Sequence, residues 1–341
     1  MGVNLADIIK ARDVTPDELR GKTVAIDAYN AIYQFLSVIR QPDGTPLKDS
    51  KGRITSHLSG LLNRNANLIE MGVRPAYVFD GIPSEMKSVT IQERHERRVK
   101  AQQEWQVSME KGETEKAFSK ATQSSRITNE IVESSRILLT HLGIPVIQAA
   151  EEGEAQAAYM AQMGVVWAAS SQDFDSLLFG APRLLRNLTL AGRRKMPGRN
   201  EYRDVKMEII DAETALKELD ISKEQLIDLC IMMGTDYNEG VSGIGPKRAL
   251  RLIREHGNFN HAMASIGKAY PEYERVKGLF LDFEKTDNYT LEWKDPDRAK
   301  VVEMLVGQYD FSEQRVNSAL DKMAPKPVKK ESKNQSSLDM F

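Results

Sequence analysis

The chain has 341 residues, which is enough for one large domain or two smaller ones with a sizeable core. Charged residues make up 28% of it while the formal net charge is only −2, so a polyanionic partner would have to be held by local basic patches. The single cysteine, Cys230, excludes a disulfide framework and a cysteine zinc site, and no apolar run reaches membrane-spanning length. We therefore expect a soluble intracellular protein.

Two short apolar segments near the N-terminus are predicted strands, and each ends in an acid. Residues 22–27 end in Asp27 and residues 76–80 end in Asp80. Between them the spacing of apolar residues predicts two helices, 28–39 and 56–71. This order predicts parallel strands covered by helices. A strand-end aspartate is often only the N-cap of the next helix, so neither acid alone indicates a site.

Residues 81–126 differ from the rest because they are highly charged and have few apolar side chains at helical spacing. Their basic residues include Lys87, Arg94, Arg97, Arg98 and Lys100. Composition alone favours a solvated helical hairpin, and the alternative is a helical segment that projects from the body. From Thr128 the helical period returns, and residues 143–148 lead back to the sheet.

Residues 151–175 place carboxylates at both ends of one predicted helix–strand unit. Glu152 and Glu154 begin the helix, a buried strand is predicted at 165–170, and Asp173 and Asp175 follow it. Ligands of open α/β sheets bind beyond the carboxyl ends of the strands. Four carboxylates repel one another unless a cation neutralises them, and oxygen ligands alone select Mg²⁺ or Mn²⁺. The alternative for the two glutamates is an acidic first helical turn exposed to water.

Further strands are predicted at 184–190 and 205–210, joined by a basic turn at 193–199. A capping box at 222–225 opens a helix that runs to residue 233. A later run puts two glycines and two cations at the mouth of another helix, as Gly243, Gly245, Lys247 and Arg248. Backbone N–H groups and the helix N-terminus would face an anion such as phosphate there, and the alternative is a plain helix-turn-helix corner. No P-loop pattern is present, which argues against nucleotide hydrolysis.

The C-terminal part is predicted to be mostly helical and amphipathic from 259 to 323. Residues 324–334 are rich in Pro, Lys and Ser and are expected to be disordered. The tail that follows has an isolated apolar pattern, formed by Leu338 and Phe341 after Gln335.

Six runs in this order closely resemble the flap endonucleases of the XPG family, most like the archaeal ones. They are Ala25-Ile-Asp27-Ala, Val78-Phe-Asp80-Gly, Glu152-Gly-Glu154-Ala, Gln172-Asp173-Phe-Asp175, Gly234-Thr-Asp236-Tyr and Gly243-Ile-Gly-Pro-Lys-Arg-Ala249. Any one could arise by chance, but the set covers essentially the whole chain and is highly specific. The resemblance implies an α/β fold with a mostly parallel central sheet flanked by helices. This PIN-like 5′ nuclease fold carries a helical arch and a helix–two-turn–helix element that binds DNA.

The resemblance also implies a division of the chain. Its parts are an N-terminal nuclease region (1–98), a helical arch or linker (99–127), an internal nuclease region with the helix–two-turn–helix (128–258), a C-terminal helical region (259–323) and a disordered tail with a clamp-binding box (324–341).

Roles for single residues follow from the same resemblance. The metal-site carboxylates would be Asp27, Asp80, Glu152, Glu154, Asp173, Asp175 and Asp236. Lys87 and Arg94 would be the catalytic basic pair at the base of the arch. DNA contacts would come from Tyr33, Arg40, Arg64, Arg97, Arg98, Gly243, Gly245, Lys247 and Arg248, with a K⁺ ion at the helix–two-turn–helix. The tail residues Gln335, Leu338 and Phe341 would bind the sliding clamp PCNA.

The implied function is that of a structure-specific 5′ flap endonuclease and 5′–3′ exonuclease. It would cut at single-strand/duplex junctions with two Mg²⁺ ions, for which Mn²⁺ can substitute. The family acts in Okazaki-fragment maturation and base excision repair, here as a monomer in the cytoplasm of an archaeon, or in the nucleus of a eukaryote. One alternative is a catalytically idle, clamp-bound DNA adaptor, which need not retain all seven acids. Another, within the family, is a junction-resolving nuclease. A phosphatase with a nucleophilic aspartate would need an Asp-x-Asp motif, and Tyr29 stands at its second acid position.

Overall fold

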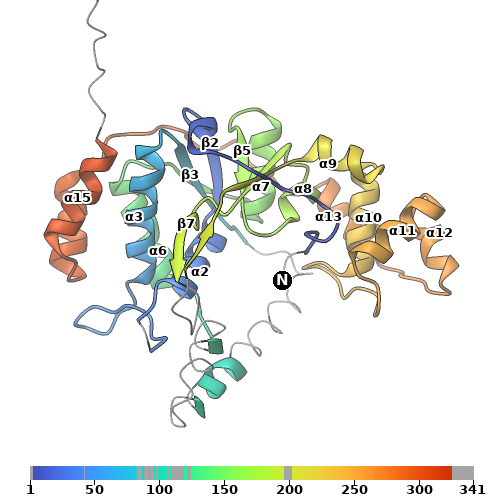
Figure 1. The fold of residues 1–341 in the computed structure, drawn as a ribbon, viewed down its shortest axis with the longest axis horizontal. Helices are drawn as coiled ribbons and strands as arrows, with labels where there is room; N and C mark the ends of the chain where they lie inside the picture. Colours follow the sequence, from blue (N-terminus) through green and yellow to red (C-terminus); the bar gives the residue numbers. More distant parts are fainter. Residues whose placement is uncertain are drawn as a thin grey trace, which may run out of the picture.

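A seven-stranded sheet forms the centre of the molecule in the computed structural model (Figure 1). The structure describes residues 3–41, 43–82, 87, 92, 96, 99–105, 107–108, 119–120, 124–195 and 202–324. In spatial order the strands are β1 (Arg12–Asp13), β9 (Glu208–Asp211), β6 (Arg183–Arg186), β5 (Ala168–Ser170), β2 (Thr23–Asp27), β3 (Arg74–Phe79) and β4 (Val146–Gln148).

The sheet is mostly parallel, as predicted. All pairs from β6 to β4 are parallel, whereas β9 runs antiparallel to both of its neighbours, β6 and β1. Strands β2 and β3 are almost wholly buried, which is the burial expected of parallel strands covered on both faces. Their carboxyl ends, and that of β5, therefore open on the same edge of the sheet.

Two hydrophobic cores lie on opposite faces of this sheet, because side chains alternate along a strand. Ile26 belongs to one core and Ala25 to the other. The first core contains α2 (Ala28–Val38), α3 (Ser56–Glu70), α6 (Asn129–His141), α14 (Arg298–Val302) and α15 (Glu313–Met323). The second contains α7 (Gly153–Gln162), α8 (Asp175–Leu178), α10 (Lys223–Met233), α11 (Pro246–His256), α12 (Phe259–Ser265) and α13 (Tyr273–Leu281). Figure 1 shows α3 and α15 at one end of the molecule and α11 and α12 at the other.

The remaining elements are α1 (Pro16–Leu19), α9 (Ala212–Leu219), the π-helical stretch η2 (Glu303–Gln308) and an antiparallel ribbon of β7 (Gly192–Lys195) and β8 (Tyr202–Val205). Of these, α1, α9 and η2 each add buried residues to one of the two cores. Within the described ranges, no helix combines the length and the apolar character needed to cross a membrane.

Several predicted boundaries are wrong, for local reasons. The strand predicted at 184–190 ends at Arg186, because Asn187 takes a left-handed backbone conformation with φ 60°. The strand predicted at 205–210 divides in two, since β8 pairs with β7 while β9 pairs with β6. The start of the basic turn predicted at 193–199 belongs to β7, and residues 196–199 lie outside the described residues.

The C-terminal region is less helical than predicted. Residues 282–297 contain no helix and run back across the molecule between α13 and α14. Trp293 Nε1 donates to the carbonyl of Pro75 at 2.7 Å, and Lys294 N donates to the carbonyl of Gly143 at 2.9 Å. Hydrogen bonds to backbone carbonyls of the body therefore replace helical hydrogen bonds in this segment.

Candidate functional site

Two acids of the site end neighbouring strands at the carboxyl edge of the sheet. Asp27 is the last residue of β2 and caps α2, accepting a hydrogen bond from Asn30 N at 3.1 Å. Asp80 follows β3 directly, and its Oδ1 accepts from Gly153 N at 2.7 Å. The strand-end N-cap considered for Asp27 is therefore real, and it also fixes the position of this carboxylate.

The acids of residues 151–175 reach the same edge from α7 and from the loop after β5. Glu152 is the N-cap position of α7, and Glu154 lies in its first turn and accepts a short hydrogen bond from Ser171 Oγ. Asp173 Oδ2 accepts from Asn30 Nδ2 at 3.2 Å. Asp175 begins α8, and its Oδ1 accepts from the backbone N of Val3 at 2.8 Å.

Asp236 comes to the site from the turn after α10 and is 7% exposed. Asp27, Glu152 and Asp175 are equally well buried, with 8%, 8% and 7% of their surface exposed. The structure thus brings buried carboxylates from four separate segments to one edge of the sheet, where the half-buried Asp80 adds a fifth segment. Ionised carboxylates in such surroundings are costly unless positive charge compensates them.

The pKa values of three of these acids show that cost. Burial, followed by repulsion from Asp80 and Asp173, raises the pKa of Asp27 to about 8. Burial and then repulsion from Asp236 and Asp173 raise the pKa of Asp175 to about 7. The pKa of Glu154 is also raised well above its usual value, first by burial and then by Asp175, Asp27 and Asp173. The charged form of each of these acids is thus repelled by the neighbouring carboxylates, so the site attracts cations.

Lys87 supplies one positive charge to this edge. Its Nζ forms a short ion pair with Glu152 Oε2 and lies 3.6 Å from Asp236 Oδ2 and 5.9 Å from the centre of the Tyr237 ring. Burial by itself lowers the pKa of Lys87, but Glu152 and Asp236 outweigh it, so the pKa is raised overall. Of the predicted basic pair only Lys87 can be placed, because Arg94 lies outside the described residues, as do Arg97 and Arg98.

The donor set fits hard divalent cations, because it consists of carboxylate oxygens without His or Cys. As they stand, however, no three His, Cys, Asp or Glu side chains of the described ranges form a ready ion-binding group. The fit rests on the burial of the acids and on the repulsion that raises their pKa values, both of which bound cations would relieve.

The predicted DNA-contacting residues fall into two groups. Tyr33 on α2 is partly buried, and Arg40 follows the same helix. Arg40 donates to the carbonyl of Gly44 at 2.6 Å and to Ser125 Oγ at 2.5 Å. Arg64 on α3 donates to the carbonyl of Ala191 at 3.1 Å. Burial lowers the pKa of both arginines.

The second group lies at the start of α11, on the other side of the molecule (Figure 1). Gly243 has φ +80°, a left-handed conformation that glycine adopts without strain, and Gly245 is an N-cap without a side-chain hydrogen bond. Lys247 and Arg248 are exposed in the first turn, where Arg248 donates to the carbonyl of Gly243 at 3.2 Å. Free N–H groups and two cations are typical of an anion-binding helix start.

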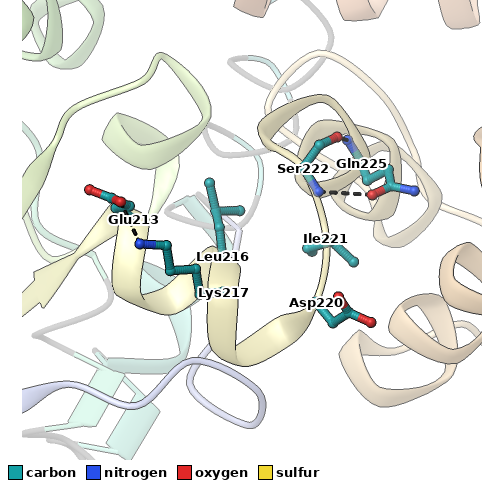
Figure 2. Close-up of a pocket in the computed structure, with 7 residues that line it drawn as sticks. All are labelled: Glu213, Leu216, Lys217, Asp220, Ile221, Ser222 and Gln225. Carbon is teal, nitrogen blue, oxygen red and sulfur yellow. Dashed lines mark hydrogen bonds and ion pairs between the residues drawn. The ribbon is translucent and has the colours of Figure 1, made fainter.

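A separate hollow of about 410 Å³ lies between α9 and the start of α10 (Figure 2). It is lined by Glu213, Leu216, Lys217, Asp220, Ile221, Ser222 and Gln225. Its polar side chains pair locally, Lys217 with Glu213 at 2.5 Å and Ser222 with Gln225 in the predicted capping box. None of the seven acids borders it, so the acidic edge of the sheet is the candidate site.

Some residues of the site were not predicted. Asn30 stands three positions after Asp27, the spacing at which an N-cap carboxylate meets a backbone N–H. Ser171 stands two positions before Asp173 and accepts from its backbone N at 3.3 Å. Those two spacings could have indicated them. Nothing local in the sequence indicates that Val3 would reach Asp175.

Comparison with known proteins agrees with this geometry. Residues 1–101 match the XPG N-terminal domain and residues 143–236 match the XPG I-region. The catalytic core of Rad2, solved in complex with DNA substrate, superposes with a TM-score of 0.70 at 25% identity, covering 95% of this chain and 100% of that one. The sheet, its acidic edge and these matches define a nuclease of the XPG class.

The chain belongs to the flap endonuclease 1 family. It is 48% identical over 323 residues to flap endonuclease 1 of Archaeoglobus fulgidus, a match that covers 95% of this chain and 96% of that protein. The flap endonuclease-1 structure from Methanococcus jannaschii superposes with a TM-score of 0.74 at 41% identity and covers 94% of this chain and 98% of its own. The family and the nuclease fold predicted from the sequence are therefore confirmed.

Proposed function

We propose that this chain cuts DNA phosphodiesters at single-strand/duplex junctions, as a 5′ flap endonuclease and 5′–3′ exonuclease. The observation that carries the proposal is the convergence of buried, mutually repelling carboxylates on one sheet edge, with Lys87 among them. The names of the relatives support the flap substrate. The cellular roles would be those of the family, Okazaki-fragment maturation and base excision repair, exercised as a monomer in an archaeal cytoplasm.

The cofactors would be two Mg²⁺ ions, which Mn²⁺ could replace. The seven acids would hold them, namely Asp27, Asp80, Glu152, Glu154, Asp173, Asp175 and Asp236. Bound there, the ions would activate water and stabilise the leaving oxygen. Protein contacts then fix how the acids point, through the backbone N of Val3 on Asp175 and the backbone N of Gly153 on Asp80.

Lys87 would act on the phosphate that reacts. Its ammonium group already lies beside Glu152 and Asp236, so a phosphate bound at these acids would come within its reach. There it would offset charge that grows in the transition state, together with Arg94. Tyr33 would stack on the base next to this phosphate. We expect Lys87→Ala to lower the single-turnover rate while leaving the Kd for DNA nearly unchanged.

The duplex would be held by its phosphates on both sides of the acids. Arg40 and Arg64 would contact one segment, with Arg97 and Arg98 from the arch near the single strand. The glycines and cations that open α11 would contact the other segment, with a K⁺ ion at this helix start. Phosphate contacts do not distinguish one base sequence from another. Selectivity would therefore come from the shape of a junction, where interrupted stacking permits a sharp bend.

The tail would recruit the enzyme to PCNA. Leu338 and Phe341 stand three positions apart, so one helical turn would place both on one side as an apolar plug, with Gln335 anchoring the turn. All three lie outside the described residues. Deleting residues 335–341 should leave cleavage of naked flap DNA unchanged and remove stimulation by the clamp. Calorimetric titration of a tail peptide into the clamp tests the contact directly.

One set of assays tests the activity. A labelled 5′-flap, a nicked duplex and a four-way junction are each incubated with Mg²⁺ and with EDTA. Preferred Mg²⁺-dependent cleavage of the flap supports the proposal, whereas preference for the four-way junction would favour a junction-resolving nuclease. Binding without cleavage would favour the idle adaptor. Asp175→Ala should abolish cleavage while binding of flap DNA in Ca²⁺ persists.

A further inference from the structure

One asparagine contacts two carboxylates of the candidate site from the first turn of α2. The backbone N of Asn30 donates to Asp27 Oδ1 at 3.1 Å, and its side-chain Nδ2 donates to Asp173 Oδ2 at 3.2 Å. Asp27 ends β2, and Asp173 follows β5, the strand that pairs with β2 in parallel. Asn30 therefore connects the two strand ends at the point where their acids meet.

The orientation of the Asn30 amide is fixed by its other contacts. Its Oδ1 accepts a short hydrogen bond from Gln34 Nε2 and another, at 3.3 Å, from the backbone N of Gln172. Because two donors face Oδ1, only the Nδ2 end of the amide can face the carboxylate. A flipped amide would place one acceptor against the oxygen of Asp173 and the Nδ2 donors against Gln34 and Gln172.

The other end of the Gln34 amide meets a buried hydroxyl. Thr189 Oγ1 donates to Gln34 Oε1 at 3.0 Å, and Thr189 is only 4% exposed. Every donor in this row thus points the same way, from Thr189 through Gln34 and Asn30 to Asp173. A row of aligned hydrogen bonds in a poorly solvated place strengthens its members, and it leaves the last amide no freedom to turn.

We propose that Asn30 is a positioning residue that holds Asp173 in its metal-binding orientation, with Gln34 and Thr189 as the row that orients it. The amide engages one oxygen of Asp173 and so restrains the rotation of this carboxylate. Partners of this kind behind metal-binding carboxylates typically change metal affinity or activity about tenfold to hundredfold when removed. The inference rests on the proposed metal site, since it concerns how one acid of that site is held.

The test uses variants that separate the side-chain contact from the backbone contact. Asn30→Ala removes the amide but keeps the backbone N–H on Asp27, and alanine suits a helical position. Thr189→Val removes the hydroxyl at nearly constant volume and perturbs only the far end of the row. The matched controls are Asn63→Ala on the exposed face of α3 and Thr140→Val on the exposed face of α6.

Two readouts are needed, and the first does not involve cleavage. Mn²⁺ binding to the DNA-free protein, measured by electron paramagnetic resonance, should weaken about tenfold to hundredfold in Asn30→Ala. It should weaken by a smaller factor in Thr189→Val and not at all in the controls. In single-turnover cleavage, Asn30→Ala should need about tenfold more Mg²⁺ for half-maximal rate, and saturating Mg²⁺ should restore most of the rate.

The outcomes distinguish this inference from the proposed function. If Asn30→Ala binds Mn²⁺ like the wild type while Asp175→Ala does not, the metal site stands and the role of Asn30 is refuted. If Asp175→Ala also binds Mn²⁺ like the wild type, the acids are not the metal site and both proposals fall. If Asn30→Ala lowers the melting temperature, the Thr189→Val variant provides the test. Wild-type Mn²⁺ affinity and Mg²⁺ dependence in that variant would refute the role of the row in orienting Asn30.

Discussion

Gly153 allows α7 to begin in contact with the carboxylate of Asp80. Its backbone N donates to Asp80 Oδ1 at 2.7 Å. A Cβ atom at this position would stand 2.8 Å from the same oxygen and 3.1 Å from the carbonyl oxygen of Val78. Ordinary contacts of this type begin at 3.4 Å, so the Asp80 carboxylate would have to withdraw by about 0.6 Å, the difference between 3.4 and 2.8 Å.

We therefore expect Gly153→Ala to damage activity far more than stability. The backbone of Gly153 is not left-handed, so alanine fits its conformation. Replacing glycine stabilises such a position by roughly 0.4–1 kcal/mol, which offsets part of the steric strain. A misplacement of about 1 Å at a reacting centre can cost about a hundredfold in rate, so a shift of this size should cost about tenfold to hundredfold.

The assay is single-turnover cleavage of a 5′-flap substrate at saturating Mg²⁺, beside thermal unfolding. Gly278→Ala is the matched control, because Gly278 lies within α13 and a Cβ there meets nothing within 4 Å. This control should cleave at the wild-type rate. A wild-type rate for Gly153→Ala would show that the close approach of α7 to Asp80 is not needed for the reaction.

The remaining predictions concern DNA binding, stability and pH. Replacing Lys247 and Arg248 together by alanine should weaken binding to duplex DNA and flatten its salt dependence by nearly two units of slope in a log–log plot, because about two fewer counterions are released; an unchanged slope in binding titrations would contradict a phosphate contact. Asp228, which is 2% exposed, pairs with Lys277 at 3.1 Å, so Asp228→Ala should lower the free energy of unfolding by about 3 kcal/mol in urea titrations. This loss is at the low end of the range for breaking a buried ion pair, because Lys277 keeps a second acidic neighbour, Glu224. Since the pKa of Asp27 is raised from its usual 3.8 to about 8, the folded protein binds more protons than the unfolded chain between these pH values. The free energy of unfolding of the metal-free protein should therefore fall as pH rises from 4 to 8, by up to about 1.4 kcal/mol per pH unit for each such acid. Saturating Mg²⁺ should remove this dependence on pH. A metal-free stability that rises with pH in this window would contradict the burial of the acid.

The sequence by itself determined most of the local elements of the nuclease region and where several of its helices begin. Helix α2 begins directly after Asp27 and the capping box opens α10 as predicted, because caps and apolar spacing act over a few neighbouring residues. Six of the seven acids could be singled out for the same reason, since each stands just past an apolar strand or at the start of a helix, whereas Asp236 follows the end of α10 and was indicated only by the family resemblance. Local spacing does not show, however, which residues become neighbours in the folded protein.

The tertiary structure decided which acids meet and what holds them. Strand β5 pairs with β2 although more than a hundred residues separate them, and this pairing brings Asp173 to Asp27 through Asn30. In the same way Val3 reaches Asp175 across 172 positions of sequence, and Lys87 pairs with Glu152, which lies 65 positions further along the chain. Such contacts depend on the order of the strands and on how the chain crosses between them. Local propensity fixes neither, because parallel strands can pair in many orders with the same pattern of buried residues.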